Sequence, residues 1–308
     1  MADKTTSISE RALVPVSPLQ PAGPIRAGAP ARFFTPEALQ RAWLAVKRAG
    51  GGAGVDAVTL TTFAARLVDE LGRLREELAA GRYRPRPVRR VLVPKPNGGL
   101  RPLALWALRD RVAQRAVYDI IAPSFETTFL PCSFGYRPGL GAEDAVREVL
   151  AYRDRNLRWV VDGDIQECFD SIPTDRLMGL VARRVEDPLL KQYVGGWLDA
   201  QILNGVDGTP AKAGASQGSV LSPLLANIYL HEVDRQLVAR KLALVRYADD
   251  LVICCQRKID AEVALTATNE ALGAWGLRLN AHKTHIIHFD QGFAWLGYFL
   301  LRDECFRL

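Results

Sequence analysis

The chain has 308 residues, 48% of them hydrophobic, and a formal net charge of +6, which is the composition of a globular protein with one or two domains. No apolar stretch is long enough to span a bilayer, and the N-terminus lacks the basic-then-apolar pattern of a signal peptide. Five cysteines without paired zinc spacing argue against a disulfide scaffold and indicate reduced thiols, so we expect a cytoplasmic protein with no membrane partner.

The first predicted helices follow a stretch without a periodic apolar pattern. Residues 1–30 are rich in Pro, Ala, Ser and Gly, which predicts a disordered arm. A short helix is expected over 37–49, with Thr35 as its N-cap and Pro36 at the first helical position. Apolar residues at helical spacing then predict a second helix over 62–80.

Positive charge is concentrated between Gly81 and Tyr118, where ten basic residues accompany a single acid. Such a concentrated field is typical of a surface that meets phosphates, although a solvated charged face is the plainer alternative. The prolines of this region and the Asn97-Gly98 turn favour a β-hairpin over a solvated helix. We therefore expect a basic hairpin here.

The remainder of the chain alternates between helical and strand patterns. Helices are predicted over 105–121, 142–152, 174–185, 188–202, 219–237 and 260–275, and strands over 157–161, 242–245, 251–255, 284–289 and 293–300. Pro223 lies near the start of its helix, where a missing backbone donor is tolerated. Strands interleaved with helices around a central acidic hairpin predict an α+β fold with an antiparallel sheet.

The most informative stretch is Arg246-Tyr247-Ala248-Asp249-Asp250, which places two adjacent carboxylates between two β-prone runs. The acids are expected in the tight turn of a hairpin. Like charges this close are costly unless a cation neutralises them, and paired Asp residues suit Mg²⁺, which prefers hard oxygen ligands. A polar Asp-rich turn is the alternative when this stretch is taken alone.

Further blocks accompany the acidic turn. Val160-Val161-Asp162-Gly163-Asp164-Ile165 is a second β-prone run that ends in acids, and Ser216-Gln217-Gly218 lies in a glycine-flanked loop that leads into an apolar helix. The other blocks are Phe134-Gly135-Tyr136-Arg137-Pro138-Gly139, Gly276-Leu277-Arg278-Leu279-Asn280 and Trp295-Leu296-Gly297-Tyr298. Together with the acidic turn and the basic hairpin, they resemble the motif series of reverse transcriptases, most closely the group II intron lineage, and they follow one another along the chain in the order of that family.

The resemblance implies the right-hand polymerase fold, with fingers and a palm whose antiparallel, ferredoxin-like sheet is backed by helices. We expect the disordered arm over 1–30, the fingers over 31–156 and the palm over 157–308. Group II intron proteins normally continue into a helical thumb and a maturase region. We therefore expect no complete thumb in this chain, and consider that another protein or chain supplies one.

The activity that the resemblance implies is RNA-directed DNA polymerisation, in which deoxynucleotides (dNTPs) extend a DNA or RNA primer on an RNA template. It implies two Mg²⁺ ions, for which Mn²⁺ can substitute, held by Asp164, Asp249 and Asp250 and by the backbone carbonyl of Ile165. Two such ions lower the pKa of the attacking hydroxyl and stabilise the leaving oxygens. Asp162 lies on the same strand face and is the main rival of Asp164, which the family pattern favours because it directly precedes the Ile-x-x-x-Phe-Asp segment.

Other positions match the substrate-binding residues of the family. Lys95 and Arg101 flank the hairpin turn and correspond to residues that close on the triphosphate, while Gln217 corresponds to a residue that contacts the nucleotide and template. Phe169 matches the bulky residue under the sugar that excludes a 2′ hydroxyl, with core packing as the alternative. Lys283 resembles the basic residue near the phosphates or the primer end.

Two further functions stay open at this point. One is a maturase-like RNA-binding splicing factor, and the other is a partner-dependent reverse transcriptase of a CRISPR adaptation or phage-defence system. The loop reads Ala215-Ser216-Gln217-Gly218-Ser219 where group II enzymes usually carry Thr-Pro-Gln-Gly-Gly, which departs from a typical intron-encoded enzyme. His285 and His288 would point to opposite faces of a strand, which argues against a histidine metal site.

Overall fold

The computed structural model divides the chain into two compact units, each of which is made of segments far apart in the sequence. Among the described residues, unit 1 consists of Leu130–Gln166 and His231–Leu308, and unit 2 of Ala22–Phe129 and Glu167–Leu230. The described residues are 23–28, 32–94, 98–203, 211–212, 214–215 and 218–308, with the side chains of 101, 211 and 212 outside the description.

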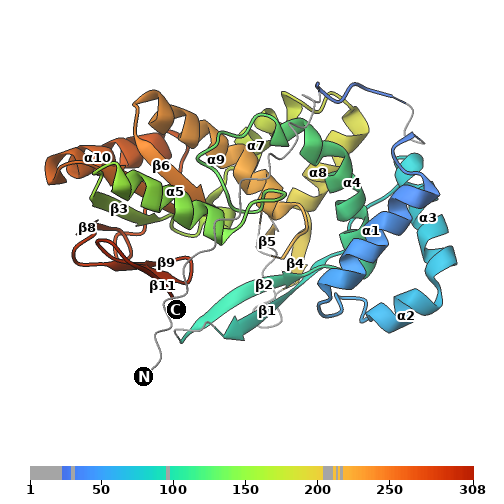
Figure 1. Ribbon diagram of the computed structural model, residues 1–308. Coiled ribbons are helices and arrows are strands. Elements are labelled where there is room, and N and C mark those ends of the chain that lie inside the picture. Colours follow the sequence, from blue (N-terminus) through green and yellow to red (C-terminus); the bar gives the residue numbers. More distant parts are fainter. Residues whose placement is uncertain (1–22, 29–31, 95–97, 204–210, 213, 216–217) are drawn as a thin grey trace. The chain divides into compact units, whose positions relative to one another are not determined.

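Unit 1 is built on a four-stranded antiparallel sheet of order β6-β7-β3-β8 (Figure 1). Its elements are α5 (Ala142–Asp154), β3 (Trp159–Asp164), β6 (Ala243–Tyr247), β7 (Asp250–Cys255), α10 (Lys258–Ala274), β8 (His285–His288), β9 (Phe293–Trp295), β10 (Tyr298–Leu300) and β11 (Cys305–Arg307). The central strands β3 and β7 come from distant parts of the chain. This arrangement confirms the predicted α+β class and its antiparallel sheet.

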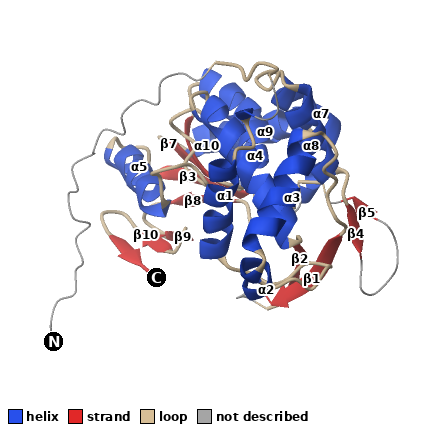
Figure 2. Ribbon diagram, turned by 90° about the vertical axis from the view of Figure 1, so that its right-hand side faces the viewer, coloured by secondary structure: helices blue, strands red, loops and turns tan. Residues whose placement is uncertain are grey.

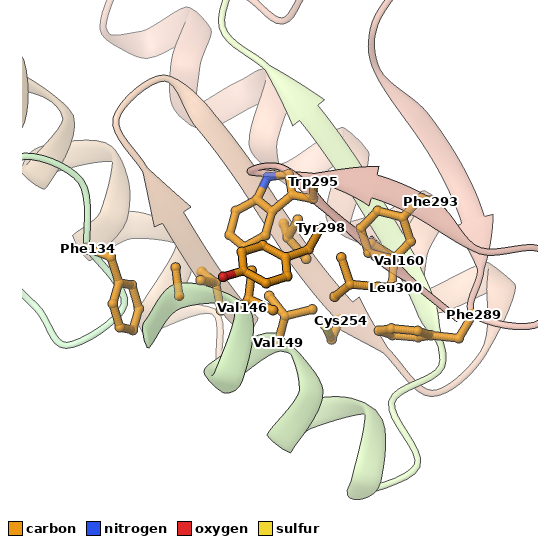
Figure 3. Packing of buried hydrophobic residues seen from close by; sticks show 13 residues of the cluster. Phe134, Val146, Val149, Val160, Cys254, Phe289, Phe293, Trp295, Tyr298 and Leu300 are labelled. Atoms are coloured by element: carbon orange, nitrogen blue, oxygen red, sulfur yellow. The ribbon is translucent and has the colours of Figure 1, made fainter. Parts of the chain in front are cut away.

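The core of unit 1 lies between the sheet, α5 and the strands β9 and β10. Because side chains alternate along a strand, Val160, Val252 and Cys254 point to one face of the sheet. There they pack against α5 and against the aromatic residues Phe289, Phe293, Trp295 and Tyr298 (Figure 3). The α10 helix contacts β3, β7 and β8 through buried alanines. The ends of β3 and β7 are therefore carried on a well-packed sheet.

Unit 2 carries the basic hairpin. Its elements are α1 (Pro36–Ala49), α2 (Leu60–Ala65), α3 (Leu67–Ala79), β1 (Val88–Pro94), β2 (Leu100–Leu105), α4 (Leu108–Glu126), α6 (Cys168–Ser171), α7 (Thr174–Ala182), α8 (Pro188–Leu198), β4 (Gln201–Leu203), β5 (Ala211–Lys212) and the beginning of α9 (Ser222–Ala239). β1 and β2 pair antiparallel in a sheet of order β2-β1-β4-β5 (Figure 2). The predicted hairpin is confirmed, and residues 95–97 of its turn lie outside the described residues.

A buried polar network anchors the chain just before β1. Asp110 of α4 accepts hydrogen bonds from the Tyr83 hydroxyl (2.6 Å) and the Arg86 amide (3.0 Å), and Trp197 Nε1 donates to the Tyr83 hydroxyl (3.0 Å). Burial raises the pKa of Asp110 to about 6, because the loss of solvent disfavours its charge more than these donors and Arg109 favour it. The network ties the base of the hairpin to α4 and α8.

The N-terminal elements agree with the sequence only in part. Thr35 caps α1, since its hydroxyl accepts from the Ala38 amide at 3.2 Å, and Pro36 is the first helical residue as predicted. The predicted disorder over 1–30 differs from the structure at residues 23–28. There the backbone of Ile25 forms a parallel bridge with Val185, which satisfies peptide groups that a disordered arm would leave to water. Residues 1–22 lie outside the described residues.

The helix predicted over 62–80 is two helices. Arg66 has φ −122° and ψ 28°, which is not helical, and it ends α2 before α3 begins at Leu67. The apolar spacing continues across this break because Phe63, Leu71, Leu74 and Leu78 are all buried. A periodic pattern reports which face is buried and does not detect a local change of the backbone.

The boundaries of the two compact units differ from those of the predicted fingers (31–156) and palm (157–308). α5 was expected in the fingers, but its apolar face packs with the sheet of unit 1. The segment 167–230 was expected in the palm, but it belongs to unit 2. Fingers and palm as functional regions stay a prediction.

Two expectations from composition can be compared with the structure. None of the described helices combines the length and the apolar character needed to cross a bilayer. All five cysteines are free thiols. Burial raises the pKa of Cys132 to about 12 and of Cys255 to about 11, so these thiols stay protonated and are poor nucleophiles.

Candidate active site

β6 and β7 form a hairpin whose two-residue turn is Ala248-Asp249. Tyr247 and Asp250 are partners across the turn. Ala248 has φ 58°, in the left-handed region, as the first residue of a two-residue hairpin turn requires. Asp249 therefore lies in the turn, as predicted, whereas Asp250 is the first residue of β7.

Asp164 ends β3 and is the direct partner of Asp250 across the central strand pair. Side chains at directly opposite positions of an antiparallel pair have Cβ atoms about 4.5–5.5 Å apart. The Ile165 amide donates to the Asp249 carbonyl (3.1 Å), and the Asn280 amide donates to the Asp164 carbonyl (2.8 Å). Three segments far apart in the sequence thus meet at one end of the sheet, within unit 1.

The carboxylates at this end of the sheet disfavour one another's charge. Burial, then the charges of Asp249, Asp164 and Asp162, raise the pKa of Asp250 to about 7. Burial is also the largest cause that raises the pKa of Asp249, with Asp164 contributing. Burial and the neighbouring carboxylates thus both disfavour ionisation of Asp249 and Asp250.

Asp162 lies beside this group, two residues before Asp164. Burial raises its pKa to about 6, while His285, its partner on β8, lowers it. His288 instead packs edge-on against the Trp159 ring, with centroids 4.9 Å apart. The two histidines therefore contact different neighbours.

Lys283 is the cation closest to the acids in the described contacts of this site. Its Nζ donates to Asp164 Oδ2 at 2.8 Å, and this hydrogen bond is the largest cause that raises the pKa of the ammonium. The side chain is 62% exposed, so the ammonium is held at the edge of the site on a flexible stem. The predicted role of Lys283 near the phosphates or the primer end stays a prediction.

The residues at this site fit a divalent cation in their chemistry. In the part of the chain that the structure describes, no three His, Cys, Asp or Glu side chains already form a group that could hold a metal ion. A hard dication would stabilise the ionised form of these crowded carboxylates, such as Asp250 with its raised pKa. The ammonium of Lys283 already lies against one of them, Asp164, so this end of the sheet accepts positive charge. Asp164 and Asp250 face each other across the strand pair, and Asp249, in the turn, precedes Asp250.

Comparison with known proteins decides the family. Residues 93–300, more than half of the chain, match the family described as "Reverse transcriptase (RNA-dependent DNA polymerase)". The chain belongs to the reverse transcriptase family. Reverse transcriptases in general use divalent metal ions, and the match supports RNA-directed DNA polymerase activity, a nucleotidyl transfer.

Relatives of this reverse transcriptase include intron-encoded proteins. Protein YkfC of Escherichia coli strain K12 is 37% identical over 295 residues, which cover 82% of this chain and 76% of YkfC. The group II intron-encoded protein LtrA of Lactococcus lactis subsp. cremoris is 32% identical over 196 residues, 63% of this chain and 33% of LtrA. A telomerase from Candida albicans has a similar fold, with a TM-score of 0.55 at 12% identity over 81% of this chain and 50% of that chain.

The relatives support the predicted group II intron-like lineage and polymerase activity, and they do not favour the maturase-like alternative over it. The chain spans about a third of the length of LtrA and half of the telomerase chain. The activity, substrates and partners of a longer protein are therefore matters for proposal.

Arg246 is a residue of the reverse transcriptase site that the sequence predictions did not include. Its side chain is 2% exposed and contacts Asp234, Ser133 and the carbonyl of Ala248. The signal that could have identified it is a lone arginine in the otherwise apolar strand 243–247, because a buried charge requires a partner. The identity of that partner depends on the fold.

The remaining predicted substrate residues of the reverse transcriptase are placed only in part. Phe169 lies in α6 of unit 2 and is 8% exposed. Lys95 and Gln217 lie outside the described residues, and the side chain of Arg101, in β2, is also outside the description. Their roles stay predictions.

Proposed function

We propose that Asp164, Asp249 and Asp250 are the catalytic carboxylates with which this reverse transcriptase extends a primer with deoxynucleotides on an RNA template. The observation that supports the proposal is the register of β3 and β7, which makes Asp164 the partner of Asp250 and leaves Asp249 adjacent in the turn. The raised pKa values of Asp249 and Asp250 add to it, since they mark a site where cations are favoured.

The three carboxylates, with the backbone carbonyl of Ile165, would hold two Mg²⁺ ions, for which Mn²⁺ can substitute. Bound there, the ions supply a lower pKa for the primer hydroxyl and stabilise the leaving pyrophosphate. Asp249 is fixed by the turn, and Asp164 and Asp250 by the sheet, so their directions are set before the substrate arrives. Such preorganised charge is the largest contribution that a protein makes to transfer of this kind.

The substrate contacts follow from the same assignment. The ammonium of Lys283 is exposed and on a long stem, so it can turn from Asp164 to a substrate phosphate when a stronger cation binds that carboxylate. By their place in the family motifs, Lys95 and Arg101 meet the triphosphate and Gln217 meets the nucleotide and template. An RNA template, a DNA or RNA primer and dNTPs are the partners that this assignment requires.

The proposal is tested with the purified chain, an RNA template with an annealed DNA primer, and dNTPs. We expect extension with Mg²⁺, loss of extension on addition of EDTA, and recovery on addition of excess Mg²⁺ or of Mn²⁺, because the carboxylates need a dication to act. The same primer on a DNA template of equal sequence is the comparison for template preference. Absence of extension on RNA with either metal would contradict the proposal.

Phe169→Val is expected to increase incorporation of ribonucleotides relative to deoxynucleotides on the order of tenfold, because a smaller side chain leaves room for a 2′ hydroxyl. Single-nucleotide extension with matched dNTP and NTP measures the ratio. Phe125→Val is the matched control, since Phe125 is another buried phenylalanine of unit 2. An unchanged sugar preference in F169V would make Phe169 a packing residue.

A further inference from the structure

The turn that carries Asp249 has an unusual backbone conformation. Ala248 has φ 58°, in a region where an L residue other than Gly is disfavoured, and Ala248 is followed directly by the two acids. A non-glycine residue persists there only when its surroundings determine the conformation. The groups that contact Ala248 therefore decide how Asp249 and Asp250 are presented.

One side chain contacts the turn from inside the protein. Arg246 Nη1 donates to the Ala248 carbonyl at 2.9 Å. The same guanidinium donates from Nε to Asp234 Oδ1 (2.7 Å) and from Nη2 to Asp234 Oδ2 (2.6 Å), a bidentate pair, and from Nη2 to Ser133 Oγ (2.8 Å). All three side chains are buried, so the guanidinium has a single fixed orientation.

The backbone around Arg246 is also held by the segment 132–135. The Arg246 amide donates to the Cys132 carbonyl (2.7 Å), and the Phe134 amide donates to the Arg246 carbonyl (2.8 Å). β6 is an edge strand of the four-stranded sheet, and this segment covers its free edge. Strand, covering segment and α9, which supplies Asp234, are thus joined by one guanidinium within unit 1.

We propose that Arg246 is a positioning residue for the polymerase reaction: its guanidinium, oriented by Asp234 and Ser133, holds the Ala248 carbonyl and thereby sets the direction of the Asp249 and Asp250 carboxylates. This inference rests on the proposed function of the two acids. The hydrogen bond from Arg246 to the Ala248 carbonyl is the contact through which this effect would reach the acids.

The shape of the arginine side chain carries the argument. A guanidinium presents its donors in a planar fork that can bind both carboxylate oxygens on one edge and a carbonyl on another. A lysine keeps the charge opposite Asp234 but offers a single nitrogen, so it cannot bridge Asp234 and Ala248 with the same geometry. If the Arg246–Asp234 ion pair only stabilised the fold, a lysine at position 246 would preserve most of its effect, because the charge is kept.

Arg246→Lys is therefore the first test. We expect kcat for primer extension and the affinity for Mn²⁺ of the protein without substrate to fall by at least about tenfold, the usual effect of removing a group that orients metal-binding side chains. KM for dNTP should change little, because the substrate contacts are untouched. Electron paramagnetic resonance of free Mn²⁺ measures the metal affinity, and hydrogen exchange should be faster in peptides spanning 246–252.

Arg240→Lys is the matched control. Arg240 lies in the same unit and pairs with Glu270 at 2.8 Å, but both side chains are exposed. This variant should keep wild-type kcat, Mn²⁺ affinity and exchange at the turn. Circular dichroism and thermal melting of both variants distinguish misplaced Asp249 and Asp250 carboxylates in a folded protein from unfolding.

A rescue experiment addresses the backbone directly. Ala248→Gly removes the penalty of the left-handed conformation, roughly 1 kcal/mol, which corresponds to about fivefold in rate. In the background of R246K it should therefore restore part of the lost kcat. If R246K does not fold, Ser133→Ala replaces it, with an expected loss of kcat of between about two- and tenfold from the missing hydrogen bond.

The outcomes separate the two proposals. If R246K folds and has wild-type kcat, Mn²⁺ affinity and hydrogen exchange at the turn, the positioning role is overturned. If R246K does not fold, wild-type values in S133A overturn it. If A248G restored no activity to folded R246K, the proposal that Arg246 acts through the backbone conformation of Ala248 would be overturned. Full primer extension by an Asp249→Asn variant would instead overturn the proposed function, whatever Arg246 does.

Discussion

Asp249→Asn should lower Mg²⁺-dependent extension of a DNA primer on RNA by roughly 10³-fold or more, since loss of a metal-binding carboxylate forfeits several kcal/mol of transition-state stabilisation. The variant keeps the shape of the side chain and removes its charge. Initial rates at saturating primer-template and dNTP measure the effect. An extension rate within a few-fold of wild type would contradict the role of Asp249.

The same substitution should leave the fold intact. Folded-state pKa values of Asp249 and Asp250 above their ordinary values mean that ionising them opposes folding, and this cost is present in full above the raised pKa, which is about 7 for Asp250. At pH 8 without metal, D249N is therefore expected to melt at or above the temperature of the wild type. Added Mg²⁺ should stabilise the wild type more than the variant.

A pair of variants on β3 provides the control. Asp164→Asn should lose activity as D249N does, because Asp164 is the cross-strand partner of Asp250. Asp162→Asn changes a neighbouring acid of the same strand face and should retain activity. Asp162 is paired with His285 on β8, whereas Asp164 is the residue directly opposite Asp250. Loss in D162N with retention in D164N would exchange their assignments.

The acidic hairpin could be predicted because its signals are local. Two β-prone runs on either side of a short acidic stretch indicate a hairpin by themselves, and Thr35-Pro36 indicates a helix start in the same way. The order of the motifs along the chain then connected Asp164 to the turn through the family resemblance. The register of β3 and β7 places the two together as that resemblance requires.

The features that sequence reasoning missed are those decided by distant partners. Nothing local indicates that Arg246 pairs with Asp234, because the two are brought together by the packing of α9 beside β6. Ile25 is ordered by backbone hydrogen bonds with Arg184 and Glu186, and residues 23–28 alone carry no pattern that predicts them. The division into units likewise follows which sheet buries the apolar face of α5, and this is a property of the folded chain.

Gly135→Ala is also expected to be strongly impaired, although Gly135 carries no side chain. A Cβ at Gly135 would lie 2.3 Å from the Ala248 nitrogen, 3.0 Å from the Tyr247 carbonyl carbon and 3.1 Å from the Ala248 Cα. The first distance is shorter than real Cβ contacts, and all three atoms are backbone, so the acidic turn or the segment 132–135 must move. A displacement of about 1 Å at catalytic groups can cost about 10²-fold in rate, which is the loss of kcat expected here.

The stability of the same variant should fall by about 1–3 kcal/mol, the usual cost of forcing an atom into a packed site. Gly273→Ala is the matched control, since Gly273 is an exposed residue of α10 in the same unit with nothing within 4 Å of its added Cβ. Because alanine favours a helix over glycine, G273A should gain roughly 0.5–1 kcal/mol and keep full activity. Wild-type kcat in G135A would show that the turn tolerates displacement, and the acids would then owe their directions to the sheet rather than to the groups packed behind the turn.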